Sequence, residues 1–159
     1  MHMKYRFAPF ILLAGMAASA GAATLSQSSL SLAQATRLAD AAVQACSAKG
    51  YNVSVTVVDA AGLTRAVQRM DKAGPHTLEA SYRKAYTAVS SGQTSGKLLE
   101  NAQKYPAAQK LSDIPGFLLL AGGVPVKEQN AVIGAIGIGG APSGDIDEAC
   151  ALEAIKSSM

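Results

Sequence analysis

The stretch Val53-Ser-Val-Thr-Val-Val58 decides the fold, because apolar and hydroxyl-bearing side chains alternate along it with a period of two. Nearly all of its residues are β-branched, and this pattern is typical of a strand with one buried face. The next residues, Asp59-Ala-Ala-Gly62, are those of a hairpin turn, and the chain is predicted to return as a second strand. Two strands joined by so tight a turn predict an antiparallel sheet.

Segments with helical spacing lie on both sides of this hairpin. Ser31 and Gln34 form a capping box that opens a helix, whose apolar face extends to Cys46, and Gly50 ends this helix. Three more helices are predicted, over residues 78–90, over residues 94–111 with a break at Pro106, and from Asp145 to Ile155.

A second β-region begins near Phe117 and reverses at Gly122-Gly123. In total the sequence predicts five strands, near residues 53–59, 62–70, 117–121, 124–127 and 131–138. Short turns make most of the strand pairs antiparallel, and helices are needed to cover the apolar sheet. The predicted fold class is therefore α+β, with a five-stranded, mostly antiparallel sheet flanked by helices.

The glycine-rich stretch Gly134-Ala-Ile-Gly-Ile-Gly-Gly140 superficially resembles a dinucleotide-binding fingerprint. Such a fingerprint joins a strand directly to a helix within a βαβ unit, whereas here the next helix begins only near Asp145. We therefore interpret these glycines as positions where a neighbouring backbone packs closely on a strand.

The N-terminus has the features of a secretory signal. Lys4 and Arg6 precede an apolar run that Pro9 interrupts, and small residues follow it. The run is shorter than the roughly 20 apolar residues that a membrane-spanning helix needs, so no stable membrane span is predicted. We expect residues 1–22 to be removed and residues 23–159 to form one domain that is periplasmic or secreted.

Composition and charge exclude several classes of protein. Of the 159 residues, 49% are hydrophobic, which is enough for a core and excludes a disordered chain. Removing Lys4 and Arg6 with the signal leaves 12 of the 14 basic residues against 11 acidic ones. A mature chain so close to neutral is not expected to bind nucleic acid.

Two regions of the chain resemble the GlcG/HbpS family. The first extends from Val57-Val-Asp-Ala-Ala-Gly-Leu63 to Arg83-Lys-Ala-Tyr-Thr-Ala88; the second includes Gly122-Gly-Val-Pro-Val126, the glycine-rich stretch and Asp147-Glu-Ala-Cys150. The resemblance covers residues 31–156. It implies a profilin-like fold, a homo-oligomer and, as in several members, haem binding; the family also includes the C-terminal domain of PduO-type corrinoid adenosyltransferases.

The resemblance does not by itself assign the residue that would bind haem iron. The histidines that ligate haem in relatives share no motif position, so the ligand has to be inferred from this chain. The chain also departs from the family at Asn130, where Gly is frequent, although Asn tolerates a positive φ as well.

His76 is the residue on which the haem hypothesis depends. His2 leaves with the signal, so His76 is the only imidazole of the mature chain, which excludes a three-histidine zinc site within one subunit. It directly precedes a predicted helix, where it could present an axial ligand to haem iron; the alternative is an N-cap or surface role. A serine triad would also need His76, but the chain has no nucleophile elbow.

Five neighbours of His76 complete the predicted haem site. Met70, Tyr82 and Tyr86 are alternative iron ligands, and the tyrosines are otherwise core aromatic residues with solvated hydroxyls. Arg83 and Lys84 are candidates to pair with the haem propionates, and are otherwise part of a solvated helix face.

Two other functions stay open at this point. The first is an enzyme or accessory protein for a small acidic metabolite, because Asp59, Arg69 and Asp71 cluster near the first hairpin and Gly122-Gly123 could offer N–H groups to an anion. The second is an assembly domain without a ligand. No residue spacing identifies a reaction, so the sequence leaves enzymatic activity undecided.

The two cysteines of the chain are expected to be separate. Export would place Cys46 and Cys150 in a compartment that permits a disulfide. However, Cys46 lies in the middle of the apolar face of its predicted helix, whereas Cys150 lies toward the margin of its own. We therefore predict two buried thiols.

Overall fold

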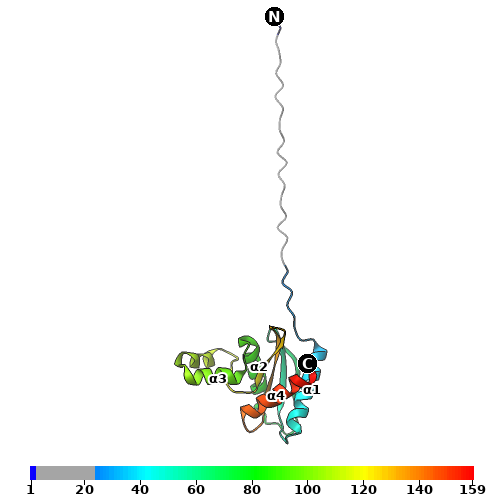
Figure 1. Ribbon diagram of the computed structural model, residues 1–159, viewed down its shortest axis with the longest axis vertical. Coiled ribbons are helices and arrows are strands. Elements are labelled where there is room, and N and C mark those ends of the chain that lie inside the picture. Colours follow the sequence, from blue (N-terminus) through cyan, green and yellow to red (C-terminus); the bar gives the residue numbers. More distant parts are fainter. Residues whose placement is uncertain (3–23) are drawn as a thin grey trace.

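The computed structural model describes residues 1–2 and 24–159, so the predicted secretory signal lies outside the described residues apart from Met1 and His2. The elements of the described part follow in the order α1-β1-β2-α2-α3-η1-β3-β4-α4 (Figure 1). Within residues 1–2 and 24–159, no helix is both long enough and apolar enough to cross a membrane.

The strands form one antiparallel sheet. They are β1 (Ser54–Asp59), β2 (Thr64–Arg69), β3 (Gly123–Glu128) and β4 (Ala131–Gly139), in the spatial order β2-β1-β4-β3. The apolar strand β4 therefore lies at the centre of the sheet. The predicted hairpin turn between β1 and β2 is confirmed, because Gly62 has a φ of 78° and the Asp59 carboxylate accepts the N–H groups of Ala61 and Leu63, each at 3.0 Å.

Residues 117–121 do not form the predicted fifth strand. The Phe117 N–H donates to the carbonyl of Ile114, and the Leu118 N–H donates to the Thr87 hydroxyl at 2.8 Å. Because a turn and a side chain use these donors, the segment has no row of free N–H groups with which to pair with a strand. The α+β class is thus confirmed, with four strands within residues 24–159, and the profilin-like arrangement stays a prediction.

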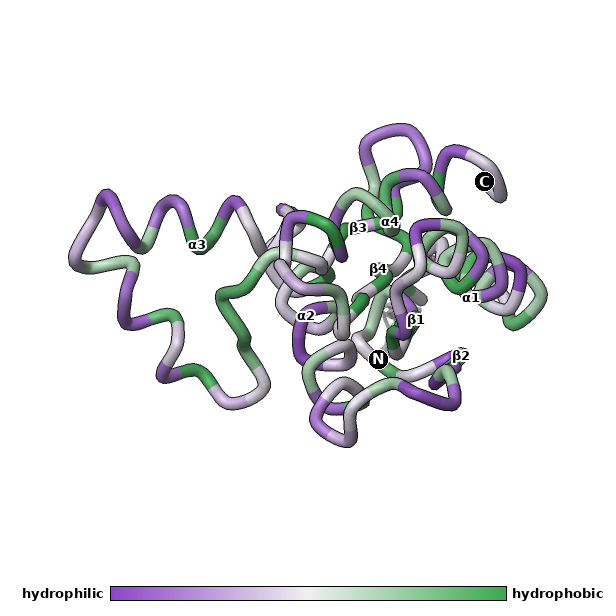
Figure 2. The backbone as a smooth tube through the Cα atoms, turned by 90° about the horizontal axis from the view of Figure 1, so that it is seen from below, coloured by the Kyte–Doolittle hydropathy of each residue, from purple (hydrophilic) through white to green (hydrophobic). Residues whose placement is uncertain are grey.

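Helices cover the two faces of the sheet. α1 (Leu32–Ser47) and α4 (Gly144–Ser158) pack together on one face, and α2 (Thr77–Ser91) packs on the other (Figure 1). The predicted capping box of Ser31 and Gln34 opens α1. α3 (Ser95–Lys104) and the 3-10 helix η1 (Pro106–Asp113) form an arm that projects from the sheet (Figure 2).

Cys46 and Cys150 form a disulfide between α1 and α4, with their Cα atoms 5.5 Å apart, so the expectation of two separate thiols is wrong. Cys150 does not lie at the margin of its helix; it shares the buried face of α4 with Ala151 and Ala154. Because α1 also presents alanines at this contact, the two helices approach closely enough for the sulfur atoms to meet.

Strand β1 is buried on both faces, and not on one as its alternation predicted. Val55 and Val57 belong to the apolar core under α1 and α4, whereas Val58 packs with alanines of α2 and β4 on the other face. Also on that face, the hydroxyl of Ser54 bonds that of Thr77 at 2.7 Å, and the hydroxyl of Thr56 bonds that of Ser81 at 2.8 Å. Hydrogen bonds to α2 thus replace the hydrogen bonds to water that the alternation suggested.

The glycines of β4 let α2 lie close to the sheet. A Cβ atom at Gly137 would lie 2.0 Å from the carbonyl oxygen of Ser81 and 2.5 Å from the amide nitrogen of Ala85. Only glycine fits at that distance, which confirms that the glycine-rich stretch serves close backbone packing.

Candidate functional site

A cavity of about 600 Å³ opens where α2 begins. It is lined by His76, by Ala80 and Lys84 of α2, by the segment 139–144 that leads from the end of β4 to the start of α4, and by Leu120 and Asp147. A second cavity of about 220 Å³ shares His76 and Ala80 and extends along α2. The larger volume falls in the range of small-molecule sites, and His76 lies on the rim that both cavities share.

The His76 side chain is not used to build the helix that it precedes. His76 is the N-cap of α2, but its backbone is helical (φ −69°, ψ −18°) instead of extended, and its side chain makes no capping hydrogen bond. The imidazole lies against Gly74, where a Cβ atom would come within 2.9 Å of its Cε1. The ring is exposed and is positioned by the Gly74-Pro75 turn.

Tyr82 and Tyr86 occupy a different side of α2. Their ring centroids are 6.0 Å apart, and the Tyr86 ring packs at 77° against that of Phe117. The Tyr86 ring also covers the hairpin turn, since a Cβ atom at Gly62 would lie 3.0 Å from it. Because neither tyrosine lines the two cavities that meet at His76, the structure does not bring them to the shared rim.

Arg83 lines the smaller cavity together with Leu118. Its guanidinium donates to the carbonyl of Phe117 at 2.5 Å and lies 3.7 Å from the Glu79 carboxylate. The side chain is 35% exposed, so Arg83 is partly anchored and partly open to solvent. It is the predicted propionate partner that the structure leaves accessible.

Lys84 is neither on a solvated helix face nor a free cation, which corrects both expectations for this residue. Its side chain is 2% exposed. The Nζ atom donates to the carboxylate of Asp147 at 2.8 Å and to the carbonyl of Ile138 at 2.9 Å. A charge so deeply buried requires such partners, and these bonds occupy the ammonium group that a propionate would have to meet.

Asp147 lies in the family-like stretch Asp147-Glu-Ala-Cys150, but no sequence pattern identified it as a residue of the site. Its side chain is 3% exposed, and it accepts bonds from Lys84 and from the Ala141 N–H at 3.0 Å. Burial raises the pKa of Asp147 above its ordinary 3.8, against the opposing effects of Lys84 and the amides of residues 140 and 141. The carboxylate follows Lys84 by 63 residues, so only the fold brings the pair together.

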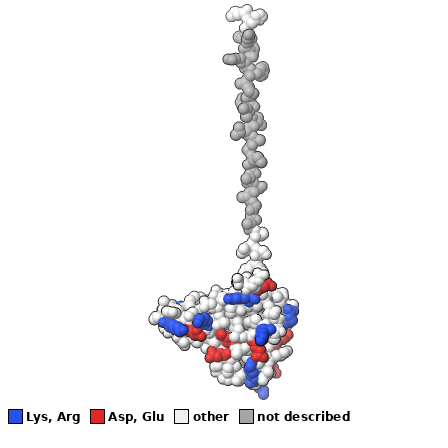
Figure 3. Space-filling model, in the orientation of Figure 1, with Lys and Arg blue, Asp and Glu red and all other residues white. Residues whose placement is uncertain are grey.

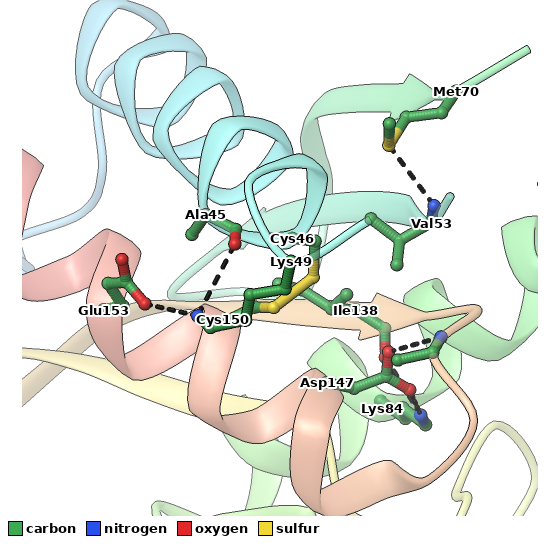
Figure 4. Close-up of a disulfide and its surroundings, with 11 residues drawn as sticks. Ala45, Cys46, Lys49, Val53, Met70, Lys84, Ile138, Asp147, Cys150 and Glu153 are labelled. Atoms are coloured by element: carbon green, nitrogen blue, oxygen red, sulfur yellow. Dashed lines mark hydrogen bonds and ion pairs between the residues drawn. A yellow bond between two sulfur atoms is a disulfide. The ribbon is translucent and has the colours of Figure 1, made fainter. Parts of the chain in front are cut away.

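Met70 lies away from His76. Its sulfur accepts the N–H of Val53 at 3.3 Å, and its side chain packs on the apolar core near α1 (Figure 4). Since α2 lies on the opposite face of the sheet, the structure separates Met70 from His76 and does not place it as an alternative ligand there.

Two of the groups suggested for an anionic metabolite, Asp59 and the Gly122-Gly123 amides, are already engaged, whereas Arg69 and Asp71 are exposed and line neither cavity at His76. Asp59 holds its own hairpin turn and pairs with Arg65 at 2.9 Å. The N–H groups of Gly122-Gly123 donate to the carboxylate of Glu148 at 3.4 Å and to the hydroxyl of Ser95 at 2.8 Å. No free pair of N–H groups is left at this turn for an anion.

Charges elsewhere on the described surface are mixed. Basic and acidic side chains alternate over the face shown in Figure 3, without a patch of one sign. A polar cavity of about 550 Å³ lies between α3 and the start of α4, lined by Lys97, Glu100, Asp145 and Glu148 among others. Over residues 1–2 and 24–159, no three His, Cys, Asp or Glu side chains are grouped closely enough to hold a metal ion.

Comparisons with known proteins identify relatives of this domain. Residues 30–156 match the family described as haem degrading protein HbpS-like. An uncharacterized 15.0 kDa protein from the dhaT-dhaS intergenic region of Citrobacter freundii is 34% identical over 119 residues, which is 70% of this chain and 80% of that protein.

Solved structures agree with this assignment. A double mutant of HbpS from Streptomyces reticuli is 42% identical, with a TM-score of 0.81 over 92% of this chain and 97% of that chain. A complex of PduOC with heme is 27% identical, with a TM-score of 0.72 over 81% of this chain and 94% of that chain. The family match covers most of the described residues, and the chain belongs to the HbpS-like family.

Proposed function

We propose that the chain is an exported haem-binding protein, in which haem lies in the cavity at the start of α2 and His76 is an axial ligand of its iron. One observation carries the proposal: His76, the only histidine of the predicted mature chain, lies exposed on the rim shared by two cavities, and its side chain makes no capping hydrogen bond. The HbpS-like family and the similarity to the PduOC complex with heme support haem as the occupant.

The residues around His76 suit a haem group. Ala80, Leu118 and Leu120 give the two cavities an apolar surface for the porphyrin ring. Arg83 lies one turn beyond Ala80 on α2, where its partly exposed guanidinium can pair with a propionate. Iron would supply the redox and ligand chemistry, and the protein would orient it through the imidazole.

Export and assembly complete the proposal. The signal-like residues 1–22 and the disulfide between Cys46 and Cys150 both suit a periplasmic or secreted protein. A homo-oligomer is proposed from the resemblance of this chain to the GlcG/HbpS family. In that setting the protein would take up, store, sense or degrade haem.

Titration with haem tests the ligand assignment. Wild-type protein is expected to develop a Soret band, and His76→Ala is expected to lose or strongly shift that band while remaining folded. Added imidazole should restore the band, because it can occupy the space that the side chain leaves. Tyr105→Ala is the matched control, since Tyr105 is 63% exposed on the arm, away from both cavities.

Two outcomes would contradict the proposal at different levels. If wild type and His76→Ala titrate haem identically, His76 is not the ligand, and Tyr82→Phe and Tyr86→Phe become the next variants to compare. If wild type binds no more haem than an unrelated protein, the cofactor is wrong. A thermal-shift screen of small carboxylates would then test the acidic-metabolite alternative.

A further inference from the structure

Lys84 and Asp147 connect several parts of the chain around the larger cavity. Lys84 Nζ bonds Asp147 and the carbonyl of Ile138, and the other carboxylate oxygen of Asp147 accepts the N–H of Ala141 (Figure 4). These three bonds join α2, the end of β4, the segment 139–144 and the first turn of α4. The pair thus connects the two sides of the cavity, which are α2 and the segment 139–144.

The segment 139–144 forms the cavity wall opposite α2 and needs such a restraint. Gly139 is the last residue of β4 and pairs with Ser54, but Gly140, with a φ of 134°, begins the connection to α4 and has the backbone freedom of glycine. His76 lies about two turns before Lys84 on α2. Because His76 is the N-cap of the helix that carries Lys84, a bond from Lys84 to the wall also fixes the wall relative to His76.

Stability alone does not explain a buried ion pair at this position. Apolar side chains of similar volume frequently replace such a pair without loss of stability. Elsewhere between α2 and the sheet, neutral hydroxyl pairs such as Thr56 with Ser81 make the polar contacts. The ionic pair occurs where the interface borders the cavity.

We propose that Lys84 and Asp147 are positioning residues, which hold the wall 139–144 at a fixed separation from His76 and so set the shape of the cavity. The proposal rests on the proposed function in one respect, that haem occupies this cavity. Neither residue is proposed to contact the iron, and both act through the wall and through α2.

The double variant Lys84→Met/Asp147→Leu separates this role from a structural one. Either single replacement would leave an uncompensated buried charge, whereas the double variant removes both charges and keeps similar volume. It is expected to unfold at a urea midpoint at or above that of wild type. Its haem affinity is expected to fall about 10- to 100-fold, as when groups that orient a metal site are removed, with a shifted Soret band.

Thr56→Val/Ser81→Ala is the matched control. This pair is as deeply buried and also joins α2 to the sheet, but it does not line the cavity. Its haem affinity and Soret band are expected to equal those of wild type.

Hydrogen exchange measured without haem tests whether the wall is held. The Ala141 amide cannot report on this, because Asp147→Leu removes its acceptor, whereas the amide of residue 147 donates to the Ser143 carbonyl of the wall at 3.3 Å and keeps this acceptor in every variant. The amide of residue 147 should exchange slowly in wild type and in the control, and rapidly in Lys84→Met/Asp147→Leu. If that amide stays protected in the double variant, or if the double variant binds haem as wild type does, the positioning role is refuted. If wild type binds no haem, the proposed function fails, and the exchange of this amide alone decides whether the pair holds the wall.

Discussion

The two faces of the sheet are stabilised by different chemistry. The face under α1 and α4 has a continuous apolar core, and the disulfide of Cys46 and Cys150 links its two helices. The face under α2 has a small apolar cluster of Val58, Ala85, Ala88 and Ala135. Its other contacts are hydroxyl pairs, the close backbone approach at glycine and the ion pair of Lys84 with Asp147.

This difference shows how one sheet can separate stability from binding. Apolar burial and a covalent link stabilise without specifying polar geometry, so the α1/α4 face can stabilise the whole domain. Polar pairs contribute less net stability but fix the orientation of groups around a cavity. The cavity and its rim residue His76 lie on the α2 face, where these polar contacts are concentrated.

Removing the disulfide is expected to have the largest effect on stability. The two cysteines are 104 residues apart, and closing so long a loop restricts the unfolded chain by about 4–5 kcal/mol in the chain-entropy account. We expect Cys46→Ala/Cys150→Ala to lose most of that free energy of unfolding, measured in urea under oxidising conditions. Haem binding at the α2 face should be unchanged.

Wild type unfolded in the presence of a reductant is the control, and it should approach the stability of the double variant. A loss smaller than about 1 kcal/mol would mean that apolar packing alone stabilises the α1/α4 face, and the contrast with the α2 face would weaken.

Local patterns predicted most of the fold because local rules govern its elements. The capping box at Ser31 and the turn at Gly62 involve residues within four positions of each other, so the sequence displays them directly. The prediction of a strand at residues 117–121 was wrong because N–H groups of this segment bond to a turn and to Thr87, which lies 31 residues from Leu118. A contact between residues so far apart produces no periodic pattern in the sequence.

Gly137→Ala tests the close approach of α2 and should have a smaller effect. The new Cβ would meet the backbone carbonyl of Ser81 at 2.0 Å, and backbone cannot move aside as a flexible side chain can. Overpacking of this kind costs about 1–3 kcal/mol, measured as a lower free energy of unfolding in urea. Because α2 would have to lift, exchange of its amides should also accelerate.

Gly50→Ala is the matched glycine control, since a Cβ there meets no atom within 4 Å and only its φ of 80° is unfavourable. Its cost is expected to be about 1 kcal/mol. Equal losses for the two variants would indicate that α2 is not held against β4 by backbone contact.

The candidate site was less predictable than the fold. His76 stood out because a lone imidazole before a helix is visible in the sequence, but for Lys84 the sequence predicted only a propionate partner or a residue of a solvated helix face. Its burial depends on the glycines of β4, which bring α2 close, and on Asp147, which follows 63 residues later. The pairing of Cys46 with Cys150 was missed for the same reason, since the rotation of α4 depends on packing.

The smallest expected effect is the pH dependence that the ion pair of Lys84 and Asp147 gives to the free energy of unfolding. It tests directly whether the polar contacts of the α2 face stabilise the fold as the apolar contacts of the α1/α4 face do. Burial raises the pKa of Asp147 in the folded state above 3.8, so the folded state binds this proton more tightly than the unfolded state does. The associated stability is fully present below pH 3.8 and is lost as pH rises through the raised pKa. Each unit of difference between the two states corresponds to about 1.4 kcal/mol.

The measurement is the free energy of unfolding of wild type minus that of Lys84→Met/Asp147→Leu, followed upward from pH 3.8. This difference should fall as pH rises and then become constant, because only wild type carries the Asp147 carboxyl group. Thr56→Val/Ser81→Ala changes no titratable group, so its difference from wild type should stay flat over the same range. A wild-type advantage that grows with pH would mean that the attraction of Lys84 outweighs desolvation, and the ion pair would then be a stabilising contact of the α2 face comparable to the apolar contacts opposite.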